Sequence, residues 1–302
     1  MESTLQNLFQ SHIGCKTLIG KNDYLFLIND RQRELFQHFC FYNINTKNIE
    51  NKLIEQNTYC NGNYLFAVFP DKSVVLSEFL PFEYNELYRP IVKNISKLDF
   101  VLDLKEIVEK NDKYIFFYKF CTHMNHIGSY IIYVHLIQLV SKKLNIDIEI
   151  LENFEILDKE DYIGDLLWDY NLGHLKVPYK SEIDKLIQFD STSIQYYVYD
   201  LKLNECNNML YRNDNLNMMY VLDSKKHDLI FKTVNSRSKN RIKILVFHDS
   251  FMLRLIPFFS YSIFECYFSW NKFNKGLIDS IKPDIVLECT VERFLLEYQH
   301  KY

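Results

Sequence analysis

Short apolar segments that end at turn residues constrain the fold of this chain most strongly. Four of them are expected to be strands: Tyr64–Phe69, Ile194–Tyr199, Ile242–Phe247 and Asp284–Glu288. The last two are almost continuously apolar, which is typical of central parallel strands that are covered on both faces. Strands and helices alternate through the second half of the chain. We therefore expect an α/β fold with an open, mostly parallel sheet flanked by helices.

Helices are expected at five places along the chain. Their ranges are Glu50–Gln56, Tyr84–Ile95, Ser129–Leu144, Glu182–Gln188 and Asn274–Ile281. No internal repeat and no low-complexity linker divides the 302 residues. We therefore expect residues 1–302 to form a single domain with helical layers on both faces of the sheet, as in the flavodoxin-like three-layer arrangement.

The net charge and the positions of the cysteines indicate which partners, cross-links and compartment to expect. The net charge is −4, whereas nucleic-acid binding normally shows as a basic excess, so we expect no nucleic-acid partner. Cysteines occur at positions 15, 40, 60, 121, 206, 266 and 289, and no two of them have C-x-x-C spacing. This pattern argues against a disulfide framework and against a zinc site, and it suits a reducing compartment.

The N-terminal residues 1–14 lack the basic region and the apolar core of a signal peptide. The most apolar run, Tyr130–Val140, is too short to span a bilayer. We therefore expect a cytoplasmic protein without stable membrane insertion, and with neither a bound cofactor nor a metal. The sequence does not indicate the oligomeric state.

A candidate nucleophile follows the strand Ile242–Phe247 directly. In an open α/β sheet, reactive groups lie at the carboxyl ends of the strands, where loops and helix starts converge. Residues 248–251 (HDSF) occupy that place, so Ser250 would sit in a sharp turn with its own N–H near a helix start, where it can stabilise an oxyanion. Asp249 could hold the turn by capping the helix. The alternative is that Asp249 and Ser250 are only a capping pair.

A serine nucleophile needs a base within hydrogen-bond reach, usually a histidine that a third group orients. Of the nine histidines, His123 and His126 stand out because they lie in a polar segment, residues 121–129. This segment separates the aromatic run Tyr114–Phe120 from an apolar helix that begins near Tyr130. A polar segment between two apolar elements indicates a layer edge, where sites form. The alternative is that both are ordinary loop histidines.

These two segments together resemble the SGNH-hydrolase-like domain of the alginate O-acetyltransferase (AlgX/AlgJ-like) family. In that family an Asp-x-His segment, typically K-T-D-T-H-W-N followed by G-A-Y, supplies acid and base, and a downstream G-D-S-[FY] segment supplies the serine. Here residues 119–125 read KFCTHMN, residues 128–130 read GSY and residues 248–251 read HDSF. The resemblance implies Ser250 as nucleophile and His123 as base.

Further matches to the family follow in the same order along the chain. They are residues 20–26 (GKNDYLF, against G-K-D-G-W-L-F), residues 69–73 with Leu80-Pro81 (against P-D-K…Y-L-P), Gly164-Asp165-Leu166 (G-D-L), and residues 282–286 with Glu292-Arg293 (a strand and E-R on a following helix). The resemblance covers roughly residues 18–296, which is nearly the whole chain.

The resemblance implies a polysaccharide O-acetyltransferase of the exopolysaccharide or capsule type. Ser250 would take an acetyl group from a donor co-substrate of unknown identity, and the acyl-enzyme would pass it to a sugar hydroxyl that His123 activates. The partner would be a carbohydrate. Asn125, Asp249 and His248 would contribute oxyanion or substrate contacts beside the backbone N–H of Ser250.

Two positions depart from the family pattern. Cys121 occupies the position of the acid, and a thiol does not orient an imidazole as a carboxylate does. His248 replaces the glycine before Asp-Ser and places a titratable ring beside the serine. Either another acid such as Asp165 substitutes, or Ser250 and His123 act as a dyad, or the site is degenerate. These alternatives leave open a carbohydrate esterase (deacetylase) with the same site and a non-catalytic glycan-binding or assembly protein.

Three other features have a plainer interpretation. The basic stretch Arg237–Lys243 could meet an anionic glycan or a nucleotide-linked donor, but we expect a solvated loop before a strand. The aromatic stretch Tyr261–Trp270 could stack on sugars, but we expect core packing. Cys121 could be a reactive thiol beside His123, but the sequence shows no electropositive surroundings, and we expect a structural role.

Overall fold

The computed structural model describes residues 2–11, 16–28, 33–40, 46–84, 87–168, 182–200, 205–209 and 229–299. Every residue proposed above for the site lies within them. The cysteine at position 15 lies outside them, and Cys40, Cys60, Cys121, Cys266 and Cys289 are free thiols.

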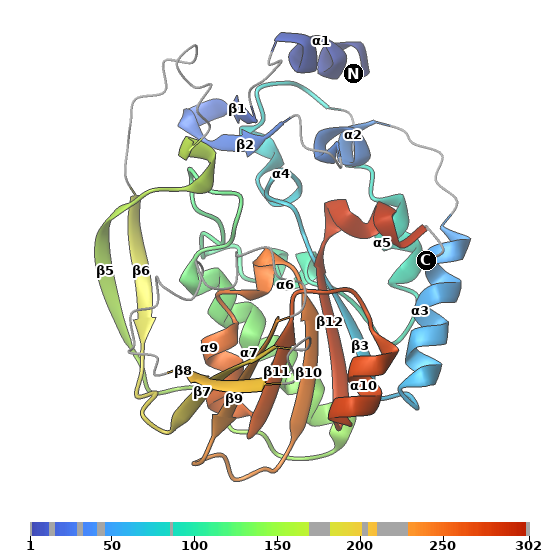
Figure 1. Ribbon diagram of the computed structural model, residues 1–302. Coiled ribbons are helices and arrows are strands. Elements are labelled where there is room, and N and C mark those ends of the chain that lie inside the picture. The colour runs from blue at the N-terminus through green and yellow to red at the C-terminus, as the bar shows by residue number, and fades with distance from the viewer. Residues whose placement is uncertain are drawn as a thin grey trace.

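The centre of the molecule is an 8-stranded sheet with the order β4-β3-β12-β10-β11-β9-β7-β8 (Figure 1). Its strands are β3 (Tyr64–Phe69), β4 (Val101–Asp103), β7 (Ile194–Asp200), β8 (Glu205–Met209), β9 (Leu229–Asn235), β10 (Lys243–His248), β11 (Glu265–Ser269) and β12 (Ile285–Val291). The strands β4, β3, β12, β10 and β11 run parallel, and β9, β7 and β8 are added antiparallel. The central position of β10 and β12 explains their apolar sequences.

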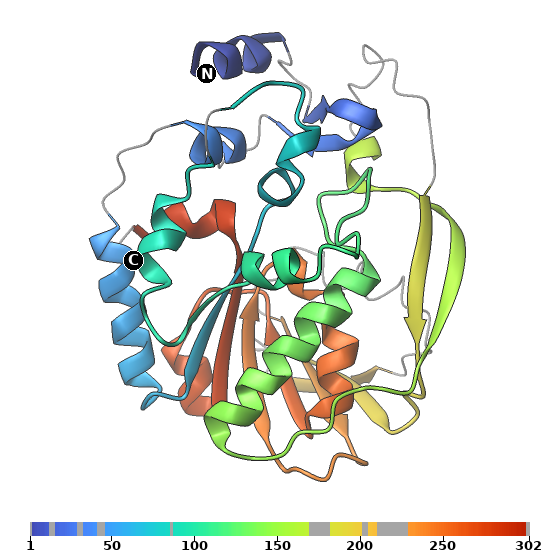
Figure 2. The same cartoon turned by 180° about the vertical axis from the view of Figure 1, so that it is seen from behind.

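Helices cover both faces of the sheet (Figures 1 and 2). One face carries α3 (Lys47–Tyr59), α5 (Pro90–Ile95), α10 (Lys275–Ile281) and the 3₁₀ segment η6 (Glu292–Gln299), and the other carries α7 (His126–Leu144), α9 (Ile256–Ser262) and the short α6 (Lys105–Lys110). The side chains of β10 alternate between the two layers. Ile244 and Val246 join the core cluster that contains α7 and α9, whereas Leu245 and Phe247 join the cluster that contains α3 and α5.

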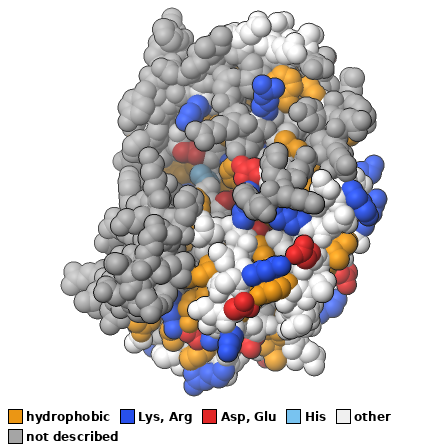
Figure 3. All heavy atoms as spheres, turned by 45° about the vertical axis from the view of Figure 1, so that its right-hand side comes forward, with side chains coloured by type: hydrophobic (Ala, Val, Ile, Leu, Met, Phe, Trp, Pro, Cys, Tyr) orange, Lys and Arg blue, Asp and Glu red, His pale blue; other side chains and the backbone are white. Residues whose placement is uncertain are grey.

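The N-terminal part of the chain lies beyond the carboxyl ends of β3 and β12, at the top of Figure 1. It consists of α1 (Glu2–Ser11), β1 (Thr17–Ile19), η1 (Lys21–Asp23), β2 (Leu25–Leu27) and α2 (Glu34–Phe39), joined by α4 (Lys72–Val75) and η2 (Ser77–Phe79). Leu18, Phe26, Leu35 and Leu80 form its separate hydrophobic cluster. On the face shown in Figure 3, the basic and acidic side chains of the described residues are interspersed.

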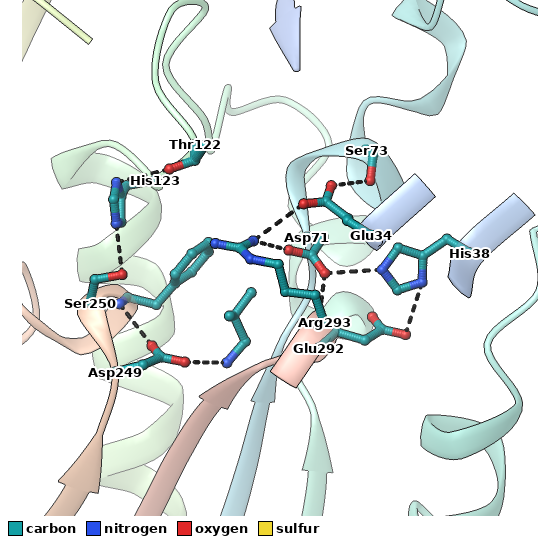
Figure 4. Close-up of polar contacts among 12 residues, drawn as sticks. Glu34, His38, Asp71, Ser73, Thr122, His123, Asp249, Ser250, Glu292 and Arg293 are labelled. Carbon is teal, nitrogen blue, oxygen red and sulfur yellow. Dashed lines mark hydrogen bonds and ion pairs between the residues drawn. The ribbon is translucent and has the colours of Figure 1, made fainter. Parts of the chain in front are cut away.

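Buried ionic contacts join this N-terminal part to the C-terminal η6 (Figure 4). The guanidinium of Arg293 pairs with the carboxylate of Asp71, and its Nη1 lies 3.4 Å from Glu34 Oε2. His38 Nε2 lies 3.0 Å from the second oxygen of Asp71. Because Asp71 is fully buried, its charge depends on these partners, and the network ties distant segments together.

A two-stranded antiparallel ribbon, β5 (Glu155–Tyr162) and β6 (Glu182–Gln188), lies beside α7, and the 3₁₀ segment η3 (Asp165–Trp168) follows β5. This ribbon holds the loop that precedes α7. The Glu182 carboxylate accepts hydrogen bonds from the backbone N–H groups of Lys119 and Phe120, each at 2.6 Å. Leu166 N–H donates to the carbonyl of Phe120 at 3.2 Å. The loop that carries His123 is therefore held by Glu182 at the start of β6 and by Leu166 in η3, which follows β5.

The four predicted strands are confirmed as β3, β7, β10 and β12; β3 has the predicted boundaries, and the boundaries of the other three are shifted by one to three residues. Three of the five predicted helices are also confirmed, within α3, α7 and α10. The α/β class with a mostly parallel sheet is thus confirmed. The length of the sheet beyond β11 was not foreseen, because β8 and β9 are not marked by long apolar runs.

Two of the helix predictions are wrong. Glu182–Gln188 is the strand β6, where Asp184 and Ile187 are buried and where pairing with β5 outweighs the helical spacing of the apolar residues. Of the described residues in the segment Tyr84–Ile95, those of Pro90–Ile95 are helical, so the predicted helix is shorter than expected. The residue before a proline is disfavoured in the α region, and Arg89 accordingly has φ −130 and ψ 60, so the helix starts at the proline. Among the described residues, no helix has the length and apolar character needed to cross a membrane.

Candidate active site

Ser250 lies at the turn that follows β10, as the first residue of the 3₁₀ segment η5 (Ser250–Met252). Asp249 precedes it in an extended conformation and holds the turn. Its carboxylate accepts hydrogen bonds from the N–H groups of Phe251 at 2.9 Å and of Val291, at the end of β12, at 2.6 Å (Figure 4). Burial raises the pKa of this carboxyl group. Asp249 thus fixes the serine turn to the neighbouring strand, and this capping contact gives no support to an oxyanion role.

His123 faces Ser250 from the loop before α7. Its Nε2 lies 2.9 Å from Ser250 Oγ (Figure 4), which is hydrogen-bond distance for a nucleophile and its base. The histidine side chain is 17% exposed and its ring packs against Phe251 at 5.3 Å between centroids. An isolated β-bridge between Phe117 and Met124 closes the loop behind it. The two residues proposed from the sequence are therefore brought together.

A carboxylate stands on the other side of the His123 ring. Asp165 Oδ2 lies 3.4 Å from His123 Nδ1. Thr122 positions that carboxylate, because its N–H donates to Oδ1 at 2.7 Å and its hydroxyl donates to Oδ2 at 2.5 Å. The Thr122 hydroxyl oxygen is also 3.2 Å from Nδ1. When the neutral ring carries its proton on Nδ1, directed to Thr122 and Asp165, the lone pair of Nε2 is available to the serine hydroxyl.

These contacts shift the pKa values of His123 and Asp165. Burial lowers the pKa of His123, but the neighbouring Cys121 sulfur and the Asp165 carboxylate outweigh it and raise the pKa to about 10. Packing around Asp165 raises the pKa of its carboxyl group, but hydrogen bonds from His123 and Thr122 outweigh this and hold the pKa well below the usual range. The ionised aspartate and the imidazolium therefore stabilise each other.

Gly164 allows Asp165 to reach this position. A Cβ atom at residue 164 would lie 2.0 Å from the carbonyl oxygen of Phe120. The backbone of η3 therefore approaches the histidine loop as closely as only glycine permits. The G-D-L match noted in the sequence thus coincides with a close backbone contact.

Cys121 lies at the position where the related pattern has its acid, and its sulfur also faces the ring. Sγ lies 3.4 Å from His123 Nδ1 and accepts a hydrogen bond from the Tyr162 hydroxyl at 3.2 Å. Arg254 Nη2 donates to that hydroxyl at 2.8 Å. The expectation that Cys121 lacks electropositive surroundings is therefore wrong, because the Arg254 guanidinium lies nearby. Arg254 is far from Cys121 in the sequence, so the sequence alone did not indicate this contact.

The structure gives Asn125 and His126 other positions. The Asn125 side chain caps α7 by accepting from Gly128 N–H at 2.8 Å, and its amide donates to Ile115 O at 2.5 Å. This capping leaves the oxyanion role of Asn125 without support. His126 begins α7 with its Nε2 3.8 Å from Asp184 Oδ2, and burial, with Arg254 and Lys159 nearby, lowers its pKa to about 3.

His248 lies on the sheet side of the serine turn. Its Nδ1 is 2.9 Å from the carbonyl oxygen of Asp249, and its ring centroid is 5.6 Å from that of Trp270. Within the described part of the chain, its buried Nε2 has no hydrogen-bond partner. Burial outweighs the contact with Asp249 and lowers the pKa of His248 to about 4, so the ring is neutral near pH 7.

Sequence reasoning missed Thr122, Tyr162 and Arg254. Thr122 lay inside the segment that carried the resemblance, but its role depends on Asp165. Arg254 is the one charged residue between Ser250 and Phe264, and an arginine in an apolar stretch is a signal that could have been noticed. Its Nε donates to Met124 O at 3.0 Å, so it also holds the loop of His123.

The fold and the paired serine and histidine define the class of this molecule. It is a three-layer α/β protein that holds a serine–histidine pair beyond the carboxyl ends of its central parallel strands. No protein-family model and no curated protein sequence matches the chain. Solved structures, in contrast, share its fold over nearly its whole length.

A DHHW family protein from Eubacterium siraeum has a TM-score of 0.64 at 16% identity, covering 92% of this chain and 94% of its own. PatB1 from Bacillus cereus, solved with a sulfonyl adduct, has a TM-score of 0.65 at 16% identity, covering 92% and 96%. The O-acetyltransferase domain of AlgJ from Pseudomonas putida has a TM-score of 0.50 at 13% identity, covering 92% and 91%. These likenesses confirm the expected resemblance at the level of the fold.

Proposed function

We propose that the protein is a serine-dependent O-acyltransferase that moves an acetyl group onto a sugar hydroxyl. The observation that carries this proposal is the 2.9 Å contact between Ser250 Oγ and His123 Nε2, with the Asp165 carboxylate 3.4 Å from the opposite ring nitrogen. The arrangement has the geometry of a nucleophile, a base and an orienting acid. The shared fold of an O-acetyltransferase domain supports the acyl-transfer class.

The first half-reaction forms the acyl-enzyme. Ser250 Oγ attacks the carbonyl carbon of the acetyl donor while its proton moves to His123 Nε2. The tetrahedral intermediate collapses when the bond between the carbonyl carbon and the donor oxygen breaks, and His123 returns the proton to that oxygen. Asp165 stabilises the imidazolium that exists between these two transfers.

The second half-reaction delivers the acetyl group. His123 Nε2 takes the proton of a sugar hydroxyl, and the resulting nucleophile attacks the acyl carbon. Collapse breaks the bond to Ser250 Oγ, which regains its proton from the ring. The backbone N–H of Ser250, at the start of η5, is the donor that we assign to the oxyanion. The scheme requires no bound cofactor.

A cavity of about 460 Å³ next to the serine turn supports a carbohydrate acceptor. It lies at the carboxyl ends of β10, β11 and β12 and is lined by residues that include His248, Asp249, Trp270 and Lys272. Ser250 and His123 are not among its lining residues, and the cavity meets the serine turn at Asp249, the neighbour of Ser250. Its size is within the range of small-ligand sites. The Trp270 ring suits stacking on a sugar, and Lys272 pairs with Glu297 at 2.7 Å, so the pair adds no net charge.

Cys121 alone favoured a degenerate, non-catalytic site. The Asp165 carboxylate, 3.4 Å from the ring, supports the catalytic alternative over the degenerate one. A carbohydrate esterase would use the same residues with water as acceptor, and the exclusion of water from the acyl-enzyme separates the two activities. The test of the function must therefore measure whether the acetyl group is transferred to a sugar or to water.

The test uses p-nitrophenyl acetate as donor and cellotetraose, chitotetraose and tetragalacturonate as separate acceptors. The proposal predicts nitrophenolate release together with an oligosaccharide that gains the mass of an acetyl group. S250A should lose both signals, whereas S236A, which removes an exposed serine hydroxyl elsewhere, should keep both. Release of nitrophenolate without sugar acetylation would indicate the esterase, and equal release by S250A would refute the serine mechanism.

A further inference from the structure

Three side chains around the candidate base also form the donor set of a metal centre. Sγ of Cys121, a ring nitrogen of His123 and a carboxylate oxygen of Asp165 lie within 4.8 Å of one another. Thiolate, imidazole and carboxylate are the donors that Zn²⁺ accepts in proteins, and Co²⁺ replaces it in such sites. We propose that Cys121, His123 and Asp165 bind a Zn²⁺-type divalent ion, and that the bound ion switches off the base.

The spacing of the donor atoms fits tetrahedral coordination. His123 Nδ1 lies 3.4 Å from Cys121 Sγ and 3.4 Å from Asp165 Oδ2. In a tetrahedral zinc site with bonds of about 2.3 Å to sulfur and about 2.0 Å to nitrogen and oxygen, neighbouring donors are roughly 3.3 to 3.6 Å apart. The two edges at His123 have this length. The third edge, between Cys121 Sγ and the Asp165 carboxylate, is within 4.8 Å, so these two groups close on the ion wherever that edge exceeds the tetrahedral value.

The outer contacts of the three donors hold them in place. The Tyr162 hydroxyl and the backbone N–H of His123 both donate to Cys121 Sγ, at 3.2 and 3.4 Å, and so fix the position of the sulfur. Thr122 donates twice to the Asp165 carboxylate and fixes its orientation. Such hydrogen bonds to the ligands are typical of metal sites, where they orient the donors.

The site is also open to an ion from solvent. The Asp165 side chain is 43% exposed, whereas Cys121 is buried and His123 is 17% exposed. An ion can therefore enter past the carboxylate, and water from the same side can complete the coordination. The bond to sulfur would form at the closed end of the site.

Metal binding and base catalysis would exclude each other. The ion binds Nδ1 and displaces its proton, and the thiol proton is also released to solvent, so the ring keeps its single proton on Nε2. A protonated Nε2 has no lone pair to accept the proton of Ser250. The proposal that the ion binds depends only on the three donor side chains. The proposal that the bound ion inactivates His123 as a base rests on the proposed function.

A titration of the metal-free full-length protein with Co²⁺ tests the site. We expect one Co²⁺ per chain, with visible bands of tetrahedral cobalt and a thiolate-to-cobalt absorption in the near ultraviolet. C121A should lose the thiolate band, whereas C60A, which removes a partly exposed cysteine elsewhere, should keep it. Y162F should bind Co²⁺ about tenfold more weakly, because it removes a hydrogen bond to the ligand. This variant keeps the test decisive if C121A does not fold.

S250A separates the site from the proposed function. It should bind Co²⁺ as the wild type does, because Ser250 is not a ligand. Zn²⁺ should inhibit p-nitrophenyl acetate turnover by the wild type, with recovery on addition of EDTA, and should inhibit C121A much less relative to that variant's own rate. No stoichiometric thiolate band in the wild type, or an unchanged band in C121A, would overturn the site. Stoichiometric Co²⁺ binding without ester turnover would leave the metal site standing and refute the proposed function.

Discussion

The Asp165 carboxylate lies 3.4 Å from Nδ1 of His123, although the two residues belong to separate segments, η3 and the loop before α7. Thr122 fixes this relationship, since it donates to both carboxylate oxygens. The opposite ring nitrogen faces Ser250 Oγ at 2.9 Å. The chain therefore offers a carboxylate to its histidine even though Cys121 occupies the position where the related pattern has one.

Replacing this carboxylate with an amide should impair the acyl-transfer step. D165N keeps the shape of the side chain but removes the charge that stabilises the imidazolium, so we expect kcat for p-nitrophenyl acetate to fall by about 10³- to 10⁴-fold. D158N is the matched control, because Asp158 forms an exposed ion pair with Lys185. A D165N rate close to that of D158N would show that another group orients His123.

The pH dependence of acyl-enzyme formation follows from the raised pKa of His123. Only the unprotonated ring can accept the serine proton, and the contacts with Cys121 and Asp165 hold the pKa at about 10 against the effect of burial. The rate should therefore rise with pH through the neutral range and level off near pH 10. In D165N the rise should occur at lower pH, because the cation loses a stabilising charge. A wild-type rate that is flat above pH 7 would contradict this assignment.

Gly164→Ala should disturb the site without touching a reacting atom. The new Cβ would meet the carbonyl of Phe120 at 2.0 Å, so η3 must move away and carry Asp165 with it. We expect a large loss of kcat together with a lower melting temperature. Gly276→Ala is the control, since its Cβ would come no closer than 3.3 Å to a side-chain atom and the residue lies in a helix. Equal behaviour of the two variants would show that the close approach is not required.

The acceptor cavity is tested by Trp270→Ala. Loss of the aromatic face should raise KM for an oligosaccharide acceptor by about tenfold, in line with the strength of aromatic contacts. The measurement is acetyl transfer at varied acceptor and saturating donor, compared with Tyr59→Ala, which alters a partly exposed aromatic residue elsewhere. If the acceptor KM of W270A equals that of Y59A, the sugar binds elsewhere.

Stability should depend on the buried ion pairs between the N-terminal part and η6. D71N removes a buried charge and leaves Arg293 without its main partner, which typically costs about 3 to 5 kcal/mol of unfolding free energy. R237A, which breaks the exposed pair with Asp190, should change stability little. Equilibrium unfolding in urea gives both values. A small effect of D71N would show that the network is not a major link between the two parts.

The central strands were predictable from local pattern, whereas the ribbon was not. β10 and β12 are apolar because they are covered on both faces, and that cause acts at every residue of each strand. The segment Glu182–Gln188 has an apolar spacing compatible with a helix, and only its pairing with β5 makes it a strand. Long-range pairing of this kind leaves no local signal.

The same distinction separates the members of the candidate site. Ser250 was predictable because it follows a central strand, and His123 because it lies in a polar segment with a family resemblance. Asp165 could be named only as one candidate, since its place depends on the contacts of η3 with Phe120. The environment of Cys121 depends on Arg254, which is distant in sequence. The catalytic roles of these residues stay predictions.

Covalent labelling with a small sulfonyl fluoride tests the central claim most directly. A sulfonyl fluoride reacts preferentially with a serine whose hydroxyl a neighbouring base activates. Peptide mass mapping should place one adduct on Ser250 in the wild type and in S236A, with labelling strongly slowed in H123Q and absent in S250A. An adduct on another serine, or labelling of S250A at the wild-type rate, would contradict the account.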